Sequence, residues 1–142
     1  MNTDINISGI HHITAVTSSA AENLAFYEKI LGLRLVKKTV NFDDPFTYHL
    51  YYGDAKGSPG TILTFFPWEN LPRGKPGAGM VTAIAFAIPR TSIAFWTRRI
   101  GAQAIRVEKS DRFGDPVLQF ADPHGLPIEL IATSDPPPTA HW

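Results

Sequence analysis

The residues of this sequence that could do chemistry are its histidines and one carboxylate set in an apolar run. The histidines are His11, His12, His49, His124 and His141. Glu129 is flanked by Ile128 and Leu130, and a carboxylate is costly to bury in such a run unless it is paired, hydrogen-bonded or metal-bound. Because the chain has no cysteine, any metal it binds must have nitrogen and oxygen ligands.

Histidines in strands together with a strand carboxylate are typical of a mononuclear metal site. Two imidazoles and one carboxylate on one side of Fe(II) leave three coordination positions open, enough for a bidentate substrate and dioxygen. Zn(II) or Mn(II) would accept the same ligands. The same residues allow another interpretation, in which a strand histidine fills the core or the rim of a sheet. Glu129 would then pair with an arginine or face water.

His49 lies in the run "TYHLYYGD", where strand alternation puts Thr47, His49 and Tyr51 on one face. An imidazole titrates near neutral pH, so His49 could deprotonate the hydroxyl of a diol or hydroquinone, or it could serve as a ligand. The alternative is a histidine hydrogen-bonded between strands in a tyrosine-rich cluster. His124, in the turn "DPHG", and His141, in the tail, are predicted to be structural.

The elements that must position these residues follow a simple order. The run from Ile10 to Val16 predicts a strand, on which only one of two adjacent histidines can face a given pocket. Ser19, three residues before Glu22, predicts a capping box that opens a helix, and Gly32 predicts its end. Three strand-like runs separated by Asp, Pro and Gly come next. The first half is therefore predicted to be βαβββ.

The second half repeats this order. "LAFYEKILG" from residue 24 and "IAFWTRRIG" from residue 93 share their apolar positions at a constant offset, 93 − 24 = 69. We expect one α+β domain over residues 1–142, made of two βαβββ modules that form a cupped, mostly antiparallel mixed sheet. The expected boundaries are module A 8–67, a Pro- and Gly-rich linker 68–79, module B 80–133, and a Pro-rich tail 134–142.

Composition excludes several classes of function. Thirteen basic and thirteen acidic residues leave no net charge and no basic stripe, so we expect no nucleic-acid partner. The first residues lack the pattern of a signal peptide, and no apolar run approaches the length of a membrane span. The expectation is a cytoplasmic protein without a membrane partner. Among the aromatic residues, Trp68 is predicted to line a pocket, because it follows Pro67 at a strand end beside the linker.

The repeated module, the opening "GIHHITAV" and the closing "DPHGLPIEL" resemble the vicinal oxygen chelate superfamily. This superfamily includes glyoxalase I, fosfomycin- and bleomycin-resistance proteins and extradiol ring-cleaving dioxygenases. The resemblance covers residues 9–132. Within residues 9–68, "FYEKILGLRLVKKTVNFDDPFTYHLYYGD" and "GSPGTILTFFPW" are similar to the N-terminal half of ring-cleaving dioxygenases of the hydroquinone type.

The resemblance implies a role for each matched residue. The first-strand metal ligand of the family matches His12, with Thr14 beside it on the same face and His11 on the other. The last-strand carboxylate ligand matches Glu129. The third ligand of single-domain members falls on Ala83, which cannot bind a metal, and the fourth ligand of glyoxalase I falls near Leu63. The expected site therefore has His12 and Glu129 as ligands, His49 as acid or base, and Thr14, Tyr51 and Trp68 in the substrate pocket.

The function implied by the resemblance is a metal-dependent extradiol-type dioxygenase, or the N-terminal half of one. It would use Fe(II), with Mn(II) or Zn(II) as alternatives, and would act on a dihydroxylated aromatic with O2. We expect a homodimer or a second vicinal oxygen chelate domain, since the cup around His12 could be completed by another domain. Two other functions stay open: a metal-free binding protein of the bleomycin-resistance type, and a metal-dependent isomerase or transferase.

Overall fold

The computed structural model describes residues 9–134, and it confirms the two βαβββ modules. Module A comprises β1 (His12–Thr17), α1 (Ala20–Leu24), a π-helical continuation η1 (Ala25–Ile30), β2 (Arg34–Val40), β3 (Tyr48–Gly53) and β4 (Ile62–Pro67). Module B comprises β5 (Ile84–Pro89), a 3-10 turn η2 (Arg90–Ser92), α2 (Ile93–Gly101), β6 (Glu108–Arg112), β7 (Asp115–Ala121) and β8 (Pro127–Thr133). Of the helices described, none is long and apolar enough to cross a membrane.

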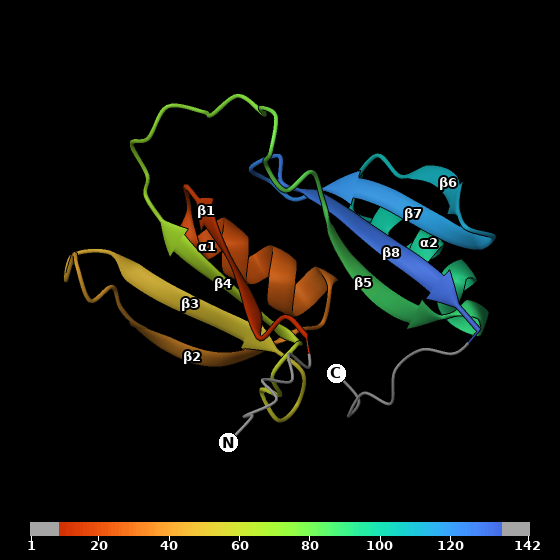
Figure 1. Ribbon diagram of the computed structural model, residues 1–142, viewed down its shortest axis with the longest axis horizontal. Helices are drawn as coiled ribbons and strands as arrows, with labels where there is room; N and C mark the ends of the chain where they lie inside the picture. The colour runs from red at the N-terminus through yellow and green to blue at the C-terminus, as the bar shows by residue number, and fades with distance from the viewer. Residues whose placement is uncertain (1–8, 135–142) are drawn as a thin grey trace, which may run out of the picture.

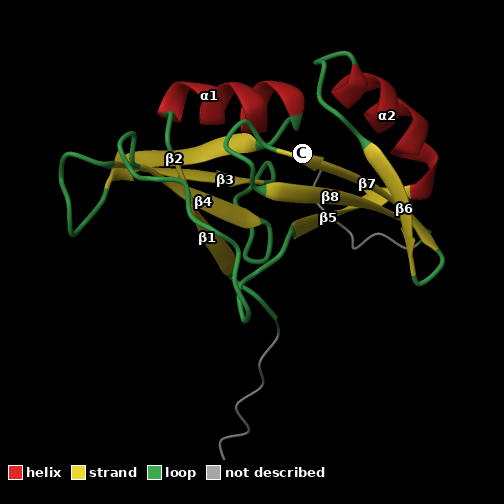
Figure 2. Ribbon diagram, turned by 90° about the horizontal axis from the view of Figure 1, so that it is seen from above, coloured by secondary structure: helices red, strands yellow, loops and turns green. Residues whose placement is uncertain are grey.

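Hydrogen bonding divides the predicted sheet into two sheets of four strands. Their orders are β1-β4-β3-β2 and β5-β8-β7-β6, and in each the first pair is parallel while the other pairs are antiparallel. The sheets lie side by side, and the segment between β4 and β5 arches across one end (Figure 1). Both helices cover the same side of the two sheets, which leaves the opposite side open (Figure 2).

The first helix begins and ends where the sequence predicts. The Ser19 side chain accepts a hydrogen bond from the backbone N–H of Glu22 at 3.2 Å, which satisfies one of the free donors of the first turn. Gly32 follows the helix with φ +76°, a conformation that glycine adopts without strain. The Ser19 start and the C-terminal glycine are therefore confirmed; the carboxylate of Glu22 lies toward His124, so Ser19 supplies the cap.

Strand alternation sorts the side chains of each sheet into a helix-facing set and an open-face set. On β4, Leu63 and Phe65 are buried in the core, whereas Thr64 and Phe66 belong to the other face. The core is continuous between the modules, because Phe26 of module A packs against Phe120 of module B with ring centroids 6.3 Å apart.

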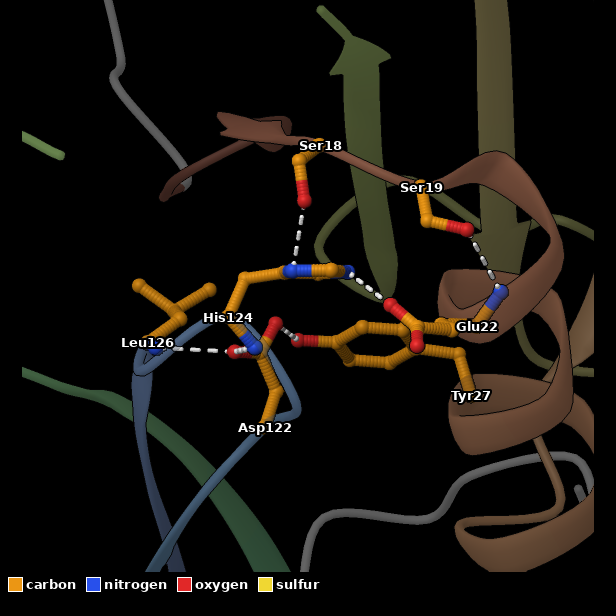
Figure 3. Close-up of polar contacts among 7 residues, drawn as sticks. All are labelled: Ser18, Ser19, Glu22, Tyr27, Asp122, His124 and Leu126. Carbon is orange, nitrogen blue, oxygen red and sulfur yellow. Dashed lines mark hydrogen bonds and ion pairs between the residues drawn. The ribbon is translucent and has the colours of Figure 1, made fainter. Parts of the chain in front are cut away.

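Polar contacts also join the two modules at the seam, the boundary where module A meets module B. Tyr27 on η1 donates its hydroxyl hydrogen bond to Asp122 Oδ2 at 3.1 Å, and both residues are buried. The other oxygen of Asp122 accepts from the backbone N–H groups of His124 and Leu126, which holds the turn between β7 and β8 in shape (Figure 3). Burial, followed by the nearby Asp122 charge, raises the pKa of Tyr27 and keeps the phenol a donor.

Replacing Tyr27 by Phe should destabilise the protein more than replacing Tyr52 by Phe. Y27F leaves a carboxylate oxygen of buried Asp122 without its partner, which costs about 1.5–3 kcal/mol in the free energy of unfolding. Tyr52 donates to the neutral amide oxygen of Asn23, so Y52F should cost about 0.5–1.5 kcal/mol. Urea denaturation of the two variants measures both values. Equal losses would show that the Tyr27–Asp122 bond contributes no more than a neutral one.

Candidate functional site

The open face of sheet A carries most of the predicted site residues. Thr14 pairs with Thr64 across the parallel β1–β4 ladder, and Thr64 pairs with Tyr51 across β4–β3, so the three side chains share a face. His12 lies two residues before Thr14, and His49 two residues before Tyr51, so they belong to the same face. The register therefore gathers His12, Thr14, His49 and Tyr51 on the side away from the helices.

A chain of hydrogen bonds links four of the side chains on this face. Tyr51 Oη lies 2.8 Å from His49 Nδ1, and His49 Nε2 lies 3.0 Å from Thr64 Oγ1. Thr64 donates to Thr14 Oγ1 at 2.9 Å. Since the Thr64 hydrogen is used toward Thr14, His49 Nε2 donates to Thr64 and Nδ1 accepts from Tyr51. The chain runs from Tyr51 through a part-buried imidazole to the exposed side of β1.

The surroundings of His49 favour its neutral form. Partial burial is the largest cause that lowers its pKa, and electrostatic repulsion from the neighbouring His12 and Lys37 lowers it further. The imidazole also lies against Phe66, with ring centroids 3.9 Å apart, and Phe66 stacks on Trp68 at 5.4 Å. Trp68 thus reaches the His49 cluster through Phe66, at the end of β4.

His12 stands at the exposed start of β1. Its Nδ1 lies 3.1 Å from Nδ1 of His11, so the prediction that the two imidazoles point to opposite faces is wrong. The reason is that β1 begins at His12, and strand alternation does not extend to His11. The contact occupies one nitrogen of His12 and leaves Nε2 for another partner.

Beside His12 is a hollow of about 330 Å³ between β1 and β5. Most of its walls are apolar, with Ile10 and Ile62 on the module A side and Ala85 and Ala87 on the module B side. Asp54 also contributes to its lining, but Glu129 does not. The hollow is therefore an apolar space with one imidazole on its wall.

Glu129 is buried, at 4% exposure, and an arginine neutralises it. Arg112 Nη2 donates to Oε1 at 2.8 Å, Arg112 Nη1 lies 2.8 Å from Oε2, and Gln119 Nε2 donates to Oε1 at 2.9 Å. These contacts match the alternative in which Glu129 pairs with an arginine. Metal ligation by Glu129 stays a prediction, and it would require Arg112 to move away or to share the carboxylate.

The internal repeat explains the Ala83 and Leu63 positions. The β3–β4 and β7–β8 connections both contain a glycine with φ +88°, Gly60 and Gly125, and the fourth residues after these are Thr64 and Glu129. Thr64 pairs with Thr14 and Glu129 pairs with Ala85. Two residues before Thr14 and Ala85 stand His12, the first residue of β1, and Ala83, which directly precedes β5, so Ala83 is the counterpart of His12. Leu63 faces the core, and Thr64 rather than Leu63 is the counterpart of Glu129.

The residues described here do not form a metal site by themselves. In residues 9–134 no group of three or more His, Asp or Glu side chains is placed to hold a cation. His12 offers one imidazole nitrogen, and the carboxylate of Glu129 is already matched by Arg112. A divalent metal would thus need donors from outside these residues.

Sequence reasoning missed two residues of this region, Thr64 and Arg112, and the contacts of a third, His124. Thr64, which connects His49 to Thr14, could have been found by aligning the two modules, since it occupies the position of Glu129. Arg112 gave no signal, because its strand is short and polar. His124 was predicted to be structural and does belong to the turn, but its ring contacts Ser18 and Glu22 of module A.

Comparisons with known proteins agree with this geometry. The profile of the Glyoxalase/Bleomycin resistance protein/Dioxygenase superfamily matches residues 9–130. The Bacillus subtilis protein named "Putative ring-cleaving dioxygenase MhqO" is 50% identical over 123 residues, which are 87% of this chain and 39% of that protein. The chlorohydroquinone/hydroquinone 1,2-dioxygenase of Sphingobium indicum is 39% identical over 129 residues, 88% of this chain and 40% of the relative.

A solved structure is also similar to this chain. The crystal structure of a "putative dioxygenase" from Bacillus subtilis superimposes with a TM-score of 0.86 at 48% identity, covering 89% of this chain and 41% of that one. The chain thus spans about two fifths of the length of these relatives. Fold, register and sequence agree: this chain belongs to the glyoxalase/bleomycin resistance protein/dioxygenase superfamily.

Proposed function

We propose that this chain forms part of a ring-cleaving dioxygenase that acts on a dihydroxylated aromatic such as a hydroquinone. Support comes from relatives named as ring-cleaving dioxygenases, one of them a chlorohydroquinone/hydroquinone enzyme. The observation that carries the proposal is the hydrogen-bonded chain from Tyr51 and His49 through Thr64 to Thr14, on the face that also holds His12. A module that only binds a ligand would not need such a chain.

The metal of this enzyme would be Fe(II), with Mn(II) or Zn(II) as alternatives, and His12 would be the ligand from this chain. The remaining donors would come from a second vicinal oxygen chelate domain, in the same polypeptide or in a partner. The relatives contain more than half of their length outside the matched region, which leaves room for such a domain. When bound, the metal would supply the site at which substrate and O2 meet.

The residues of this chain would bind the substrate and handle its protons. A single aromatic ring fits the apolar hollow of about 330 Å³, where Ala85 and Ala87 leave space beside His12. Thr14 does not line the hollow, but it lies two residues from His12 on the same face of β1. A substrate hydroxyl that reaches Thr14 would pass its proton to Thr14, Thr14 would pass one to Thr64, and Thr64 would pass one to His49 Nε2. Because Nε2 carries the proton in the structure, this transfer requires the other neutral tautomer of His49, with Nδ1–H donated to Tyr51, Nε2 free and both threonine hydroxyls turned toward His49. The transfer leaves His49 as an imidazolium.

A metal-free binding protein of the bleomycin-resistance type is the second candidate. The observations that favour it are the Arg112–Glu129 ion pair and the alanine at position 83, which leave module B without a free ligand on its open face. In that function the hollow beside His12 would bind a planar molecule without changing it. The dioxygenase would need His12 for turnover, whereas the binding protein would have no turnover.

A chimera tests the dioxygenase proposal directly. This chain replaces the matching segment of the Sphingobium hydroquinone dioxygenase, and the purified protein is loaded anaerobically with Fe(II). We expect hydroquinone-dependent O2 uptake, and we expect His12→Ala to reduce both iron content and rate by more than about a hundredfold, since even outer-shell changes at metal sites cost 10–100-fold. Glu129→Gln should keep its iron and lower only the melting temperature.

Two outcomes would contradict this assignment of ligands. If E129Q lost iron to the same extent as H12A, the two side chains would share one cation, as the sequence alone predicts. If a chimera that is folded by circular dichroism and loaded with iron consumed no O2, the binding-protein function would be favoured. Lys109→Gln, a polar change on exposed β6, controls for the effect of substitution itself.

His49 should titrate below the ordinary histidine value of 6.5, because burial and repulsion from His12 and Lys37 oppose its protonation. Its native pKa is lower than its unfolded pKa, so its contribution to stability is complete above 6.5 and is lost as the pH falls below that value. NMR titration of the imidazole measures the midpoint. Lys37→Gln should raise it, whereas Lys29→Gln should not, and an unmoved midpoint in K37Q would contradict the electrostatic account.

A further inference from the structure

Outside the cup, a second hollow lies where the linker crosses the seam between the modules. Its volume is about 560 Å³, and its lining includes Val16, Thr17, Ser18, Trp68, Arg73 and His124. These residues come from the end of β1, the end of β4, the linker and the β7–β8 turn. The proposed dioxygenase function uses none of them. Trp68, expected from the sequence in the substrate pocket, lines this second hollow and not the one beside His12. This second hollow is therefore separate from the proposed active site.

Arg73 supplies a positive charge at this hollow, and Gly125 explains its position. The guanidinium of Arg73 lies directly over Gly125 of the β7–β8 turn, in the space that a Cβ at this position would take. The described lining contains no carboxylate. Two acidic groups of the seam are already engaged, since Asp122 accepts from Tyr27 and two backbone N–H groups, and Glu22 lies beyond the far nitrogen of His124. Near Trp68, the side chain of Asp44 accepts a hydrogen bond from the Trp68 indole.

Ser18 and His124 form a coupled pair on the wall of the hollow. His124 Nδ1 lies 2.8 Å from Ser18 Oγ, and its Nε2 lies 3.5 Å from Glu22 Oε2 (Figure 3). A neutral imidazole that keeps its proton on Nε2, toward Glu22, accepts the Ser18 hydrogen at Nδ1. A protonated imidazole donates to Ser18 instead, which frees the Ser18 hydrogen to point at a ligand.

The rest of the lining suits a hydrocarbon body. Trp68, Val16, Leu71 and Pro72 form apolar walls, and the Thr17 hydroxyl is a buried donor with no partner in the part of the chain that is described. A single guanidinium fork matches a carboxylate, whereas a dianionic phosphate would call for more positive charge. An apolar wall with a few convergent polar groups is the usual form of a small-molecule site.

We propose that this hollow binds a small organic carboxylate, with its charge on Arg73 and Ser18 and its apolar part against Trp68. His124, which holds Ser18 through its ring nitrogen, forms the wall behind that hydroxyl. The site stands whether or not the chain cleaves aromatic rings.

Benzoate is the probe, and benzamide is its neutral counterpart of the same shape. Isothermal titration of the full chain, without metal, measures the affinity. We expect saturable benzoate binding, at least about tenfold weaker in Arg73→Gln, because the charged fork is lost. The nearby Lys75→Gln is the matched control and should bind normally. His124→Gln should bind more weakly, because it removes the ring that holds Ser18 in place.

NMR shifts identify where the probe binds. Benzoate should shift the Trp68 indole and the Ser18 and Gly125 amides, and it should do so equally in His12→Ala. Equal binding of benzamide, equal affinity of R73Q and K75Q, or shifts confined to the His12 hollow would each overturn the proposal. Since no metal or turnover is involved, failure here leaves the dioxygenase proposal untouched, and failure of the chimera leaves this site untouched. Ser18→Ala, which removes one hydroxyl, provides a second variant if H124Q does not fold.

Discussion

The register of the two parallel pairs, β1–β4 and β5–β8, is the constraint on which the site depends. Side chains alternate between the helix-covered side and the open side, so a shift of one residue would exchange His12 and Thr14 for Ile13 and Ala15. Leu63 and Phe65 prevent such a shift, because their burial against the helix of module A fixes the face of β4. Thr64 is then directed to the open face, where it connects His49 with Thr14.

The sequence predicted the fold well because the fold is built from local signals that occur twice. The Ser19 cap, the Gly32 end and the alternating runs each act within a few residues, and the repeat at an offset of 69 gives an independent check. These local signals could not show whether β1 and β5 hydrogen-bond to each other. Whether two edge strands pair depends on their approach in space, and here the described strands form two separate ladders.

The site was harder to predict, since its partners come from distant positions. Tyr51 and His49 were placed together by alternation alone, and the structure adds their hydrogen bond. Glu129 was recognised as a carboxylate that needs a partner, but nothing local indicated Arg112, 17 residues earlier on a fully exposed strand. His11 does not follow strand alternation, because β1 begins at His12. Boundaries and long-range ion pairs are the features that sequence patterns describe least well.

The two modules have diverged at equivalent positions, and this divergence decides what each open face can do. Module A has His12, Thr14 and Thr64 where module B has Ala83, Ala85 and Glu129. Burying Glu129 is tolerable only with a cation beside it, and Arg112 and Gln119 meet that need within module B itself. Within residues 9–134, His12 contacts His11 but has no such charged partner, and it remains exposed beside an apolar hollow. The face of module A is thus the one left with unused chemistry, and a complementary domain with free carboxylate and imidazole groups is what it would need to become a metal site.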